Sequence, residues 1–410
     1  KQAAFQRAST LPNFDSASAV DDKIVKVKLT KPHSGFLYGM SDWRNTIIPR
    51  DFVEKGGDFS KIGTLYGTGP WILDTYSDQK VVFKPNPSFW EKGKPYLDTE
   101  TWLMYGDTLS SQTAFGNGQL DVIAGGGKSV NDAIVKLNSK AREENWVFGN
   151  WDHIRFNTTK KPFDDPRVRL AFFKIFNYKD WADSFYGAGK WDYTGPLAAA
   201  FAEGIPSADI QKMAGYNPST KNDDIKAAKD ALSAAGFPDG QGISFKIMPF
   251  RNTGVQYENA VRAVDNLKAA LSKVQVDIDL PADTTVFSRR QIGGDFDVIS
   301  YTLFPAPDAV IEMTNNVYST GGRNYGKFKD SQIDQLIDKA AIQLDTKARA
   351  ETLKQAQKLL IEQHMPTIHY SMPKLQYFFN PKLQNMTKFG GAIGGGSYDV
   401  ALNLRNASFA

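Results

Sequence analysis

Arg251 and Asn252 are the residues of this sequence best suited to recognise a charged ligand. They follow residues 243–248, an apolar stretch that predicts a buried strand. A guanidinium group can pair with a carboxylate through two parallel hydrogen bonds, and a side-chain amide can bridge polar groups. We therefore interpret both residues as ligand-binding candidates, with a solvated surface arginine as the alternative for Arg251.

Three aromatic residues are further ligand-binding candidates, and two of them lie at the end of a second predicted strand, residues 297–301. Tyr301 ends this strand and Phe304 follows it, while Trp151 lies earlier in the chain. Such rings could stack on an organic ligand, or they could fill an apolar wall. Both interpretations stay open from the sequence.

Two polar candidates lie in loops beside predicted helices. Asp308 could contact a ligand, or it could cap a helix over residues 309–313. Asn324 lies in the loop ahead of a predicted helix at 331–342. A further candidate is Gly126, in a Gly-rich loop whose backbone N–H groups could approach an anion, with simple loop flexibility as the alternative.

Catalytic interpretations find little support. The four histidines are scattered, and His364 and His369 lie five residues apart across Pro366, which is not the spacing of a helical metal-binding pair. The sequence has no cysteine, no G-x-S-x-G elbow, no P-loop and no H-E-x-x-H motif. The adjacent Asp164 and Asp165 are better suited to capping a helix that begins with Pro166. We expect no cofactor.

Strands and helices alternate in the part of the chain that carries these candidates. The pattern predicts strands at 243–248, 275–280 and 297–301, with helices at 256–271 and 284–290 between them. Such alternation predicts an α/β fold with a mixed or parallel sheet. Further expected elements are helices at 224–235, 331–342 and 346–363 and strands at 24–29, 367–370 and 375–379.

The composition is that of an ordinary globular protein. The 410 residues are 41% hydrophobic and 23% charged, with a formal net charge of +4. Because the charge is mild and no basic run is present, nucleic acid is not an expected partner. No apolar run approaches the ~18 residues needed for a membrane span.

An ordered series of turn and aromatic residues begins at Gly67. Its strand segments, at 71–76 and 80–84, predict a hairpin. The series comprises Gly67-Thr68-Gly69-Pro70-Trp71, Asn86-Pro87-Ser88-Phe89-Trp90 and Gly93-Lys94-Pro95-Tyr96-Leu97-Asp98. It resembles the signature of family 5 extracellular solute-binding proteins, the oligopeptide- and dipeptide-type receptors of ABC importers. A second box, from Phe156-Asn157 to Arg167-Val168-Arg169, resembles the same family.

The resemblance implies a fold and a division of the chain. The fold would be α/β and similar to type II periplasmic binding proteins, with two lobes that hold mixed sheets, a hinge between them and the ligand in the interlobe cleft. It also implies that an N-terminal portion is missing. The expected parts are a remnant of a small auxiliary domain at 1–63, a first lobe at 64–156, a second lobe at 157–382 and a return to the first lobe at 383–410.

The function implied by the resemblance is capture of a peptide or similar small organic solute and its delivery to ABC permease subunits. The protein would be a monomer, periplasmic or extracellular and membrane-tethered, touching the membrane only through the permease or a lost anchor. The alternatives are a carbohydrate-active hydrolase, suggested by the 12% aromatic content, and a protein that binds nickel or a metal chelate.

The sequence departs from the family at one informative place. In peptide-type members the strand matching Phe296-Asp297-Val298 is followed by Gly-Trp and then by an Asp that pairs with the free amine of the ligand. Residues 299–306 contain no carboxylate, and Asp308 comes about two residues later. Because an unpaired ammonium is costly in a closed cleft, this departure argues against the usual mode of peptide recognition.

Overall fold

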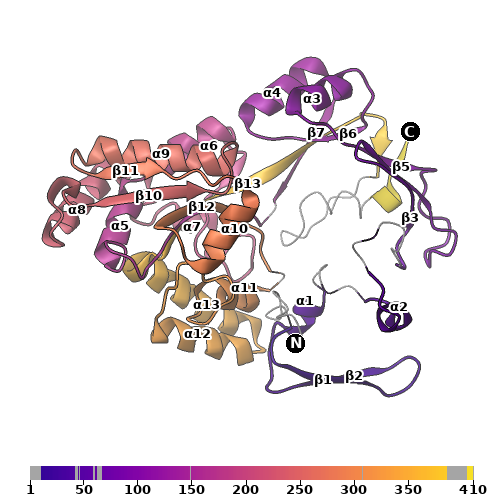
Figure 1. Ribbon diagram of the computed structural model, residues 1–410, viewed down its shortest axis with the longest axis horizontal. Coiled ribbons are helices and arrows are strands. Elements are labelled where there is room, and N and C mark those ends of the chain that lie inside the picture. The colour runs from indigo at the N-terminus through magenta and orange to yellow at the C-terminus, as the bar shows by residue number, and fades with distance from the viewer. Residues whose placement is uncertain are drawn as a thin grey trace. The chain divides into compact units, whose positions relative to one another are not determined.

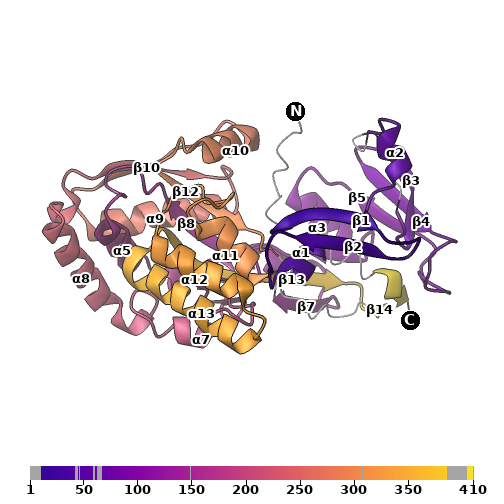
Figure 2. The ribbon, with the colours of Figure 1, turned by 90° about the horizontal axis from the view of Figure 1, so that it is seen from below.

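The computed structural model describes residues 11–41, 45, 47–58, 61, 67–147, 149–306, 308–385 and 404–409 (Figures 1 and 2). The chain forms two compact units. The larger unit comprises Lys1–Asp42 and Phe148–Pro373, and the smaller unit comprises Trp43–Val147 and Lys374–Ala410.

The larger unit holds most of the helices. Its strands are β1 (Phe14–Ala19), β2 (Val25–Leu29), β8 (Trp151–Phe156), β9 (Trp191–Asp192), β10 (Ser244–Pro249), β11 (Gln275–Ile278), β12 (Val298–Leu303) and the first part of β13 (Thr367–Phe379). Its helices are α1 (Phe36–Met40), α5 (Pro166–Ile175), α6 (Tyr178–Phe185), α7 (Ser207–Ile210), α8 (Lys221–Ala234), α9 (Val255–Ala270), α10 (Thr284–Gly293), α11 (Ala309–Val317), α12 (Ser331–Ile342) and α13 (Thr346–Leu359). A π-helical turn, Leu360–His364, extends α13.

The central sheet of the larger unit is mixed, with the strand order β11-β10-β12-β8-β13. Strand β10 pairs in parallel with β11 and β12, whereas β8 pairs antiparallel with β12 and β13. This arrangement confirms the mixed sheet expected from the alternation of strands and helices. Because β10 and β12 are parallel, their carboxyl ends meet at the same edge of the sheet.

Helices cover both faces of this sheet. Ile247 and Val298 share a core cluster with Ala263 of α9, while their neighbours Met248 and Ile299 pack with Phe287 of α10. Since successive side chains of a strand point to opposite faces, α9 and α10 lie on opposite faces of the sheet (Figure 1). The α9 face holds the larger core, in which Phe156, Phe163, Phe172 and Phe245 pack ring against ring.

The N-terminal segment docks on the helical layer of the larger unit. The backbone N–H of Ser34 donates to the carbonyl of Ala341 at 2.8 Å. A Cβ added to Gly35 would lie 2.3 Å from Oδ1 of Asp308, so only glycine permits this approach. Strand β1 pairs with β2 and was not predicted, because its small and polar residues are exposed on both faces.

The smaller unit contains the signature residues. Its elements are α2 (Arg50–Glu54), β3 (Trp71–Tyr76), β4 (Lys80–Pro85), β5 (Glu100–Leu103), α3 (Thr108–Gly116), β6 (Val122–Ala124), α4 (Lys128–Leu137), β7 (Arg142–Val147), β14 (Leu383–Gln384), β15 (Ser408–Phe409) and the second part of β13. Strands β3 and β4 form the predicted hairpin, and β5 joins it as a third strand. Residues 374–379 of β13 pair with β6 and β7.

The boundaries of the units differ from the ranges expected from the sequence. Residues 1–42 belong to the larger unit because Ser34 and Gly35 contact α11 and α12. Strand β8, expected in the first lobe of 64–156, belongs with 148–373 because it pairs with β12. The chain returns to the smaller unit at Lys374, inside β13, and not at residue 383.

Candidate solute-binding edge

The carboxyl ends of β10 and β12 bring several predicted residues to one edge of the sheet. Arg251 and Asn252 follow β10 and are exposed, and Phe304 follows β12 and is 46% exposed. Tyr301, near the end of β12, is half-buried. We call Phe250, Arg251, Asn252, Tyr301 and Phe304 the β10/β12 edge.

Aromatic rings build the floor of this edge. Phe250 lies 5.4 Å from Tyr301 and 5.1 Å from Phe287, measured between ring centroids. Tyr301 in turn stacks on Phe287 at 5.7 Å. These contacts anchor the rings on the α10 face while Phe304 stays accessible, an arrangement suited to stacking on an organic solute.

The charge of the edge comes from Arg251. Its guanidinium carbon lies 5.0 Å from the centroid of the Phe250 ring, a cation–π geometry. Among the residues that the structure describes, no hydrogen bond or ion pair joins Arg251 to another side chain. The guanidinium group is therefore positioned by the ring and keeps its donors available for an anionic group.

Two arginines, the buried Arg155 and the half-buried Arg323, lie behind the edge. Arg155 of β8 is 1% exposed, donates to the carbonyl of Arg323 and to Oδ1 of Asn316, and has its pKa lowered to about 10 by burial and by Arg323. Arg323 lies 3.6 Å from the carboxylate of Glu312 and donates to the carbonyl of Phe304 at 3.1 Å. The hydrogen bond from Arg323 holds the loop after β12 in place, and the two arginines put positive charge beside that loop.

Asp308 lies in the interior and has structural partners. It is 3% exposed and accepts hydrogen bonds from the backbone N–H groups of Val310 and Ile311 at 2.9 and 3.1 Å, which makes it the N-cap of α11. Its other oxygen lies 3.5 Å from Arg349. Burial raises the pKa of Asp308, against the opposing effects of its hydrogen bonds and of Arg349. The geometry favours the capping interpretation over ligand contact.

Asn324 also has structural partners. It is 6% exposed, donates to the carbonyls of Tyr318 and Phe328 and accepts from the N–H of Phe328. All three of these hydrogen bonds join the Asn324 side chain to backbone groups, so Asn324 closes the turn ahead of α12. The structure does not bring it to the β10/β12 edge as an exposed group.

Trp151 and Gly126 are not among the exposed groups of the β10/β12 edge. Trp151 is fully buried, and its indole N–H donates to Nδ1 of His369. Gly126 belongs to the smaller unit, where its backbone N–H donates to Oδ1 of Asn131 at 2.9 Å. That N–H already has an acceptor within the unit.

Sequence reasoning missed a buried carboxylate near the end of β12. Asp152 of β8 is fully buried and accepts hydrogen bonds from Thr302, Ser371 and Tyr186. Burial raises its pKa, while these three hydroxyl donors lower it. The sequence offers no clear signal for this role, because the hydroxyl partners of Asp152 come from distant parts of the chain.

The described residues contain no group of three or more His, Asp or Glu side chains that could hold a metal ion. None of the helices in the described part of the chain is long and apolar enough to cross a membrane.

Comparisons with known proteins agree with the resemblance seen in the motifs. Residues 1–325 match the model of the bacterial extracellular solute-binding proteins, family 5 Middle. The periplasmic murein peptide-binding protein MppA of Escherichia coli K12 is 24% identical over 357 residues, which are 86% of this chain and 64% of that protein. The chain thus spans about two thirds of the length of this relative.

Solved structures show the same mixed α/β fold. DppA of Helicobacter pylori, in complex with the peptide STSA, superposes with a TM-score of 0.79 at 18% identity, covering 100% of this chain and 77% of that one. AgaA of A. tumefaciens R10, in complex with agropinic acid, gives a TM-score of 0.75 at 19% identity, covering 98% and 79%. The family match spans most of the chain and includes both motif regions. The chain therefore belongs to family 5 of the bacterial extracellular solute-binding proteins, which bind solutes and are not enzymes.

Proposed function

We propose that this protein is the substrate-binding component of an ABC importer and that its cargo is a small organic solute carrying a carboxylate, such as a peptide or an opine. The protein would close about a hinge on the solute and present it to the permease subunits. Closure needs contacts that the solute makes with both lobes only in the closed state. The protein would work as a periplasmic or surface-tethered monomer without a cofactor.

The observation that carries the choice of ligand is the exposed Arg251 beside the rings of the β10/β12 edge. A guanidinium group that keeps its donors available can pair with a carboxylate in bidentate fashion. No carboxylate occurs in residues 299–306, and Asp308, the next one along the chain, caps α11. These two features together favour recognition of an acid group over recognition of a free ammonium group.

Related proteins bind ligands of this kind. MppA is described as binding murein peptide, and the solved structures of DppA and AgaA hold a peptide and agropinic acid. All these ligands carry carboxylate groups, and we propose that the solute bound by the present chain carries one as well.

A thermal-shift screen of the full-length protein tests the proposal. The panel would contain peptides with free and amidated C-termini, the same peptides with free and acetylated N-termini, opines, sugars and metal chelates. We expect acid-bearing solutes to raise the melting temperature and C-terminal amidation to remove the effect. If only sugars or metal chelates stabilise the protein, the proposed ligand class is wrong; if nothing does, the receptor function itself is contradicted.

A further inference from the structure

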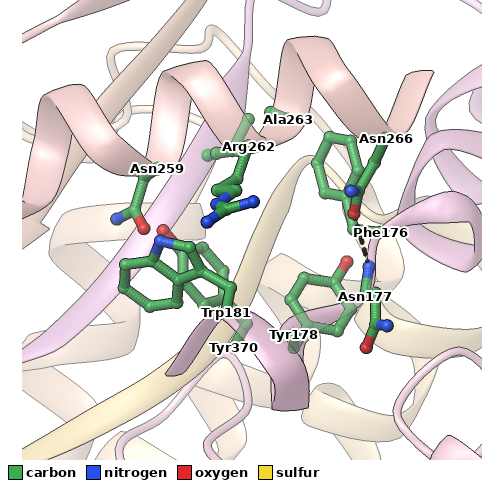
Figure 3. A pocket seen from close by; sticks show the side chains of 10 residues that line it. Phe176, Asn177, Tyr178, Trp181, Asn259, Arg262, Ala263, Asn266 and Tyr370 are labelled. Atoms are coloured by element: carbon green, nitrogen blue, oxygen red, sulfur yellow. Dashed lines mark hydrogen bonds between the residues drawn. The ribbon is translucent and has the colours of Figure 1, made fainter. Parts of the chain in front are cut away.

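A second, small pocket lies on the other face of the sheet from the β10/β12 edge. Residues of α9 form one wall of it, and the start of α6 forms another (Figure 3). Ile154 of β8 and Tyr370 of β13 also line it. Ile154 faces this pocket, whereas its neighbour His153 contacts Tyr301 of the edge. Because neighbouring strand residues point to opposite faces, the pocket is separate from the candidate solute site.

One face of helix α9, which carries mostly polar side chains, lines this pocket. Asn259, Arg262, Ala263 and Asn266 line it at the spacing of one helix face. Oδ1 of Asn266 already accepts a hydrogen bond of 2.7 Å from the backbone N–H of Asn177 (Figure 3). Asn266 thus closes one end of the pocket, and Asn259 and Arg262 supply the polar groups that remain.

Two buried side chains in this pocket lack hydrogen-bond partners. Asn259 and Tyr370 are each 3% exposed, and both amide atoms of Asn259 and the hydroxyl of Tyr370 have no partner among the described residues. Leaving such a group unsatisfied costs roughly 1–3 kcal/mol. Tyr370 is held in place by rings, with Tyr178 stacked at 5.3 Å and Trp181 edge-on at 5.5 Å. The Tyr370 side chain is thus fixed, and its hydroxyl is available to hydrogen-bond a polar group that enters the pocket.

The available groups are mostly donors. Burial raises the pKa of Tyr370, so its hydroxyl stays protonated, and the Asn259 amide contributes two further N–H groups. Arg262 is exposed at the rim and has no ion pair or hydrogen bond with any residue in the described ranges. The charge of Asp152 also raises the pKa of Tyr370, but the oxygens of Asp152 already accept hydrogen bonds from Thr302, Ser371 and Tyr186.

Size and shape restrict the ligand. The cavity volume is about 20 Å³, and a single water needs roughly 10–15 Å³. One carboxylate oxygen fits the interior, where it would face Asn259 and Tyr370, while the rest of the acid would extend past Arg262 toward solvent. A cation is disfavoured by the guanidinium group at the entrance.

We propose that this pocket binds the carboxylate group of a small organic acid, independently of the solute carried at the β10/β12 edge. Figure 3 shows Asn259 and Arg262 projecting from α9 toward the rings of Trp181 and Tyr370. The acid would receive a charge-assisted pair of hydrogen bonds from Arg262 and further hydrogen bonds from Tyr370 and Asn259. Tyr370 is the bulged residue of β13, between His369 and Ser371, three residues before that strand leaves the larger unit.

Indole N–H resonances of the full-length protein provide the test, with acetate as the probe. The Trp181 signal would be assigned with Trp181→Phe, and sodium acetate would be titrated against sodium chloride at equal ionic strength. We expect acetate, but not chloride, to shift the Trp181 resonance in a saturable way. Loss of the Arg262 guanidinium in Arg262→Gln should weaken the apparent affinity about tenfold, and Tyr370→Phe should weaken it severalfold.

Two controls separate this site from the others. Arg289→Gln removes an exposed arginine from α10 and should leave the acetate response unchanged. Arg251→Gln should also leave it unchanged, even if it abolishes solute binding, so the two proposals can fail separately. A shift that is linear and equal for acetate and chloride would mean that the pocket holds only water, and a saturable shift that survives Arg262→Gln would likewise overturn the assignment.

Discussion

The indole N–H of Trp151 donates a hydrogen bond of 2.6 Å to Nδ1 of His369, and both side chains are buried. Nδ1 can accept this bond only when the imidazole is neutral. Burial, helped by the charge of Arg155, holds the pKa of His369 well below its usual value. The neutral tautomer is thus part of the folded structure, because charging the ring would cost both the hydrogen bond and its desolvation.

Acid should destabilise the protein through His369. Its pKa in the folded protein lies below the unfolded value near 6.5. The contribution of the neutral His369 to the free energy of unfolding is therefore present above pH 6.5 and is lost as the pH falls. The groups that face it are Trp151, Arg155 and His153, and His153 is held neutral in the same way, by burial and by Arg155. We expect His369→Gln, which keeps an acceptor for Trp151, to reduce the loss of stability below pH 6.5 by up to about 1.4 kcal/mol per pH unit.

Urea denaturation at pH 7.5, 6.5 and 5.5 would measure the difference between wild type and variant. A poor fit of the glutamine adds a loss of stability that is the same at all three pH values, so the test is the difference in pH slope between wild type and His369→Gln. An unchanged pH slope would contradict the buried neutral histidine.

Arg349 should be essential for stability because it balances two buried carboxylates. It pairs with Glu203 and lies 3.5 Å from Asp308, and all three are buried. Removing one partner of such a group typically costs about 3–5 kcal/mol. We expect Arg349→Met to lower the free energy of unfolding by this amount in chemical denaturation. Lys358→Met, an exposed position on the same helix, is the matched control and should change it by less than about 0.5 kcal/mol.

Arg251→Ala should weaken the binding of solutes that carry an acid group, and should leave the binding of neutral solutes unchanged. A charge-assisted hydrogen bond is worth about 1.5–3 kcal/mol, so the dissociation constant of such a solute should rise by about tenfold or more. Isothermal titration with a solute and its amide would show the selectivity. Arg289→Ala should bind both as the wild type does, and an equal loss for acid and amide in Arg251→Ala would remove Arg251 from the recognition of carboxylates.

Phe304→Ala should affect binding more than stability. The ring is 46% exposed, so its truncation should change the free energy of unfolding by no more than about 0.5 kcal/mol. If Phe304 stacks on the solute, affinity for solutes with a ring or an apolar side chain should fall about threefold to tenfold. Leu344→Ala, at an 80% exposed position, is the control for a generic surface effect. Unchanged affinity with all such solutes would show that Phe304 takes no part in binding.

Local signals were reliable where the structure depends on neighbours in sequence. The helix predicted at 331–342 is α12 with the same bounds, and Asp165 caps α5 with Pro166 in its first turn. The alternation of strands and helices correctly gave β10, α9, β11, α10 and β12 within a few residues. These elements follow from periodicity, capping and turn residues, all of which act over a few positions.

Strand pairing between residues far apart in the sequence was not predicted. Strands expected separately at 367–370 and 375–379 form the single strand β13, because Met372 and Pro373 between them pair with β9. The helix expected at 346–363 becomes a π-helical turn after Leu359 and ends at Met365, whose φ is 39°. For β13, a partner far along the chain decides the local conformation.

The sequence by itself determined the family, since the series from Gly67 to Asp98 and the box around Pro166 are ordered strings of residue types that need no structure to be read. It also determined that Arg251 follows a strand. Only the tertiary structure decided which candidates share a surface: it leaves Arg251 and Phe304 exposed at one edge and encloses Asp308, Asn324 and Trp151 among internal partners. The physical reason is that exposure and hydrogen-bond satisfaction depend on groups brought together from distant positions, as Asn259 and Tyr370 are at the second pocket.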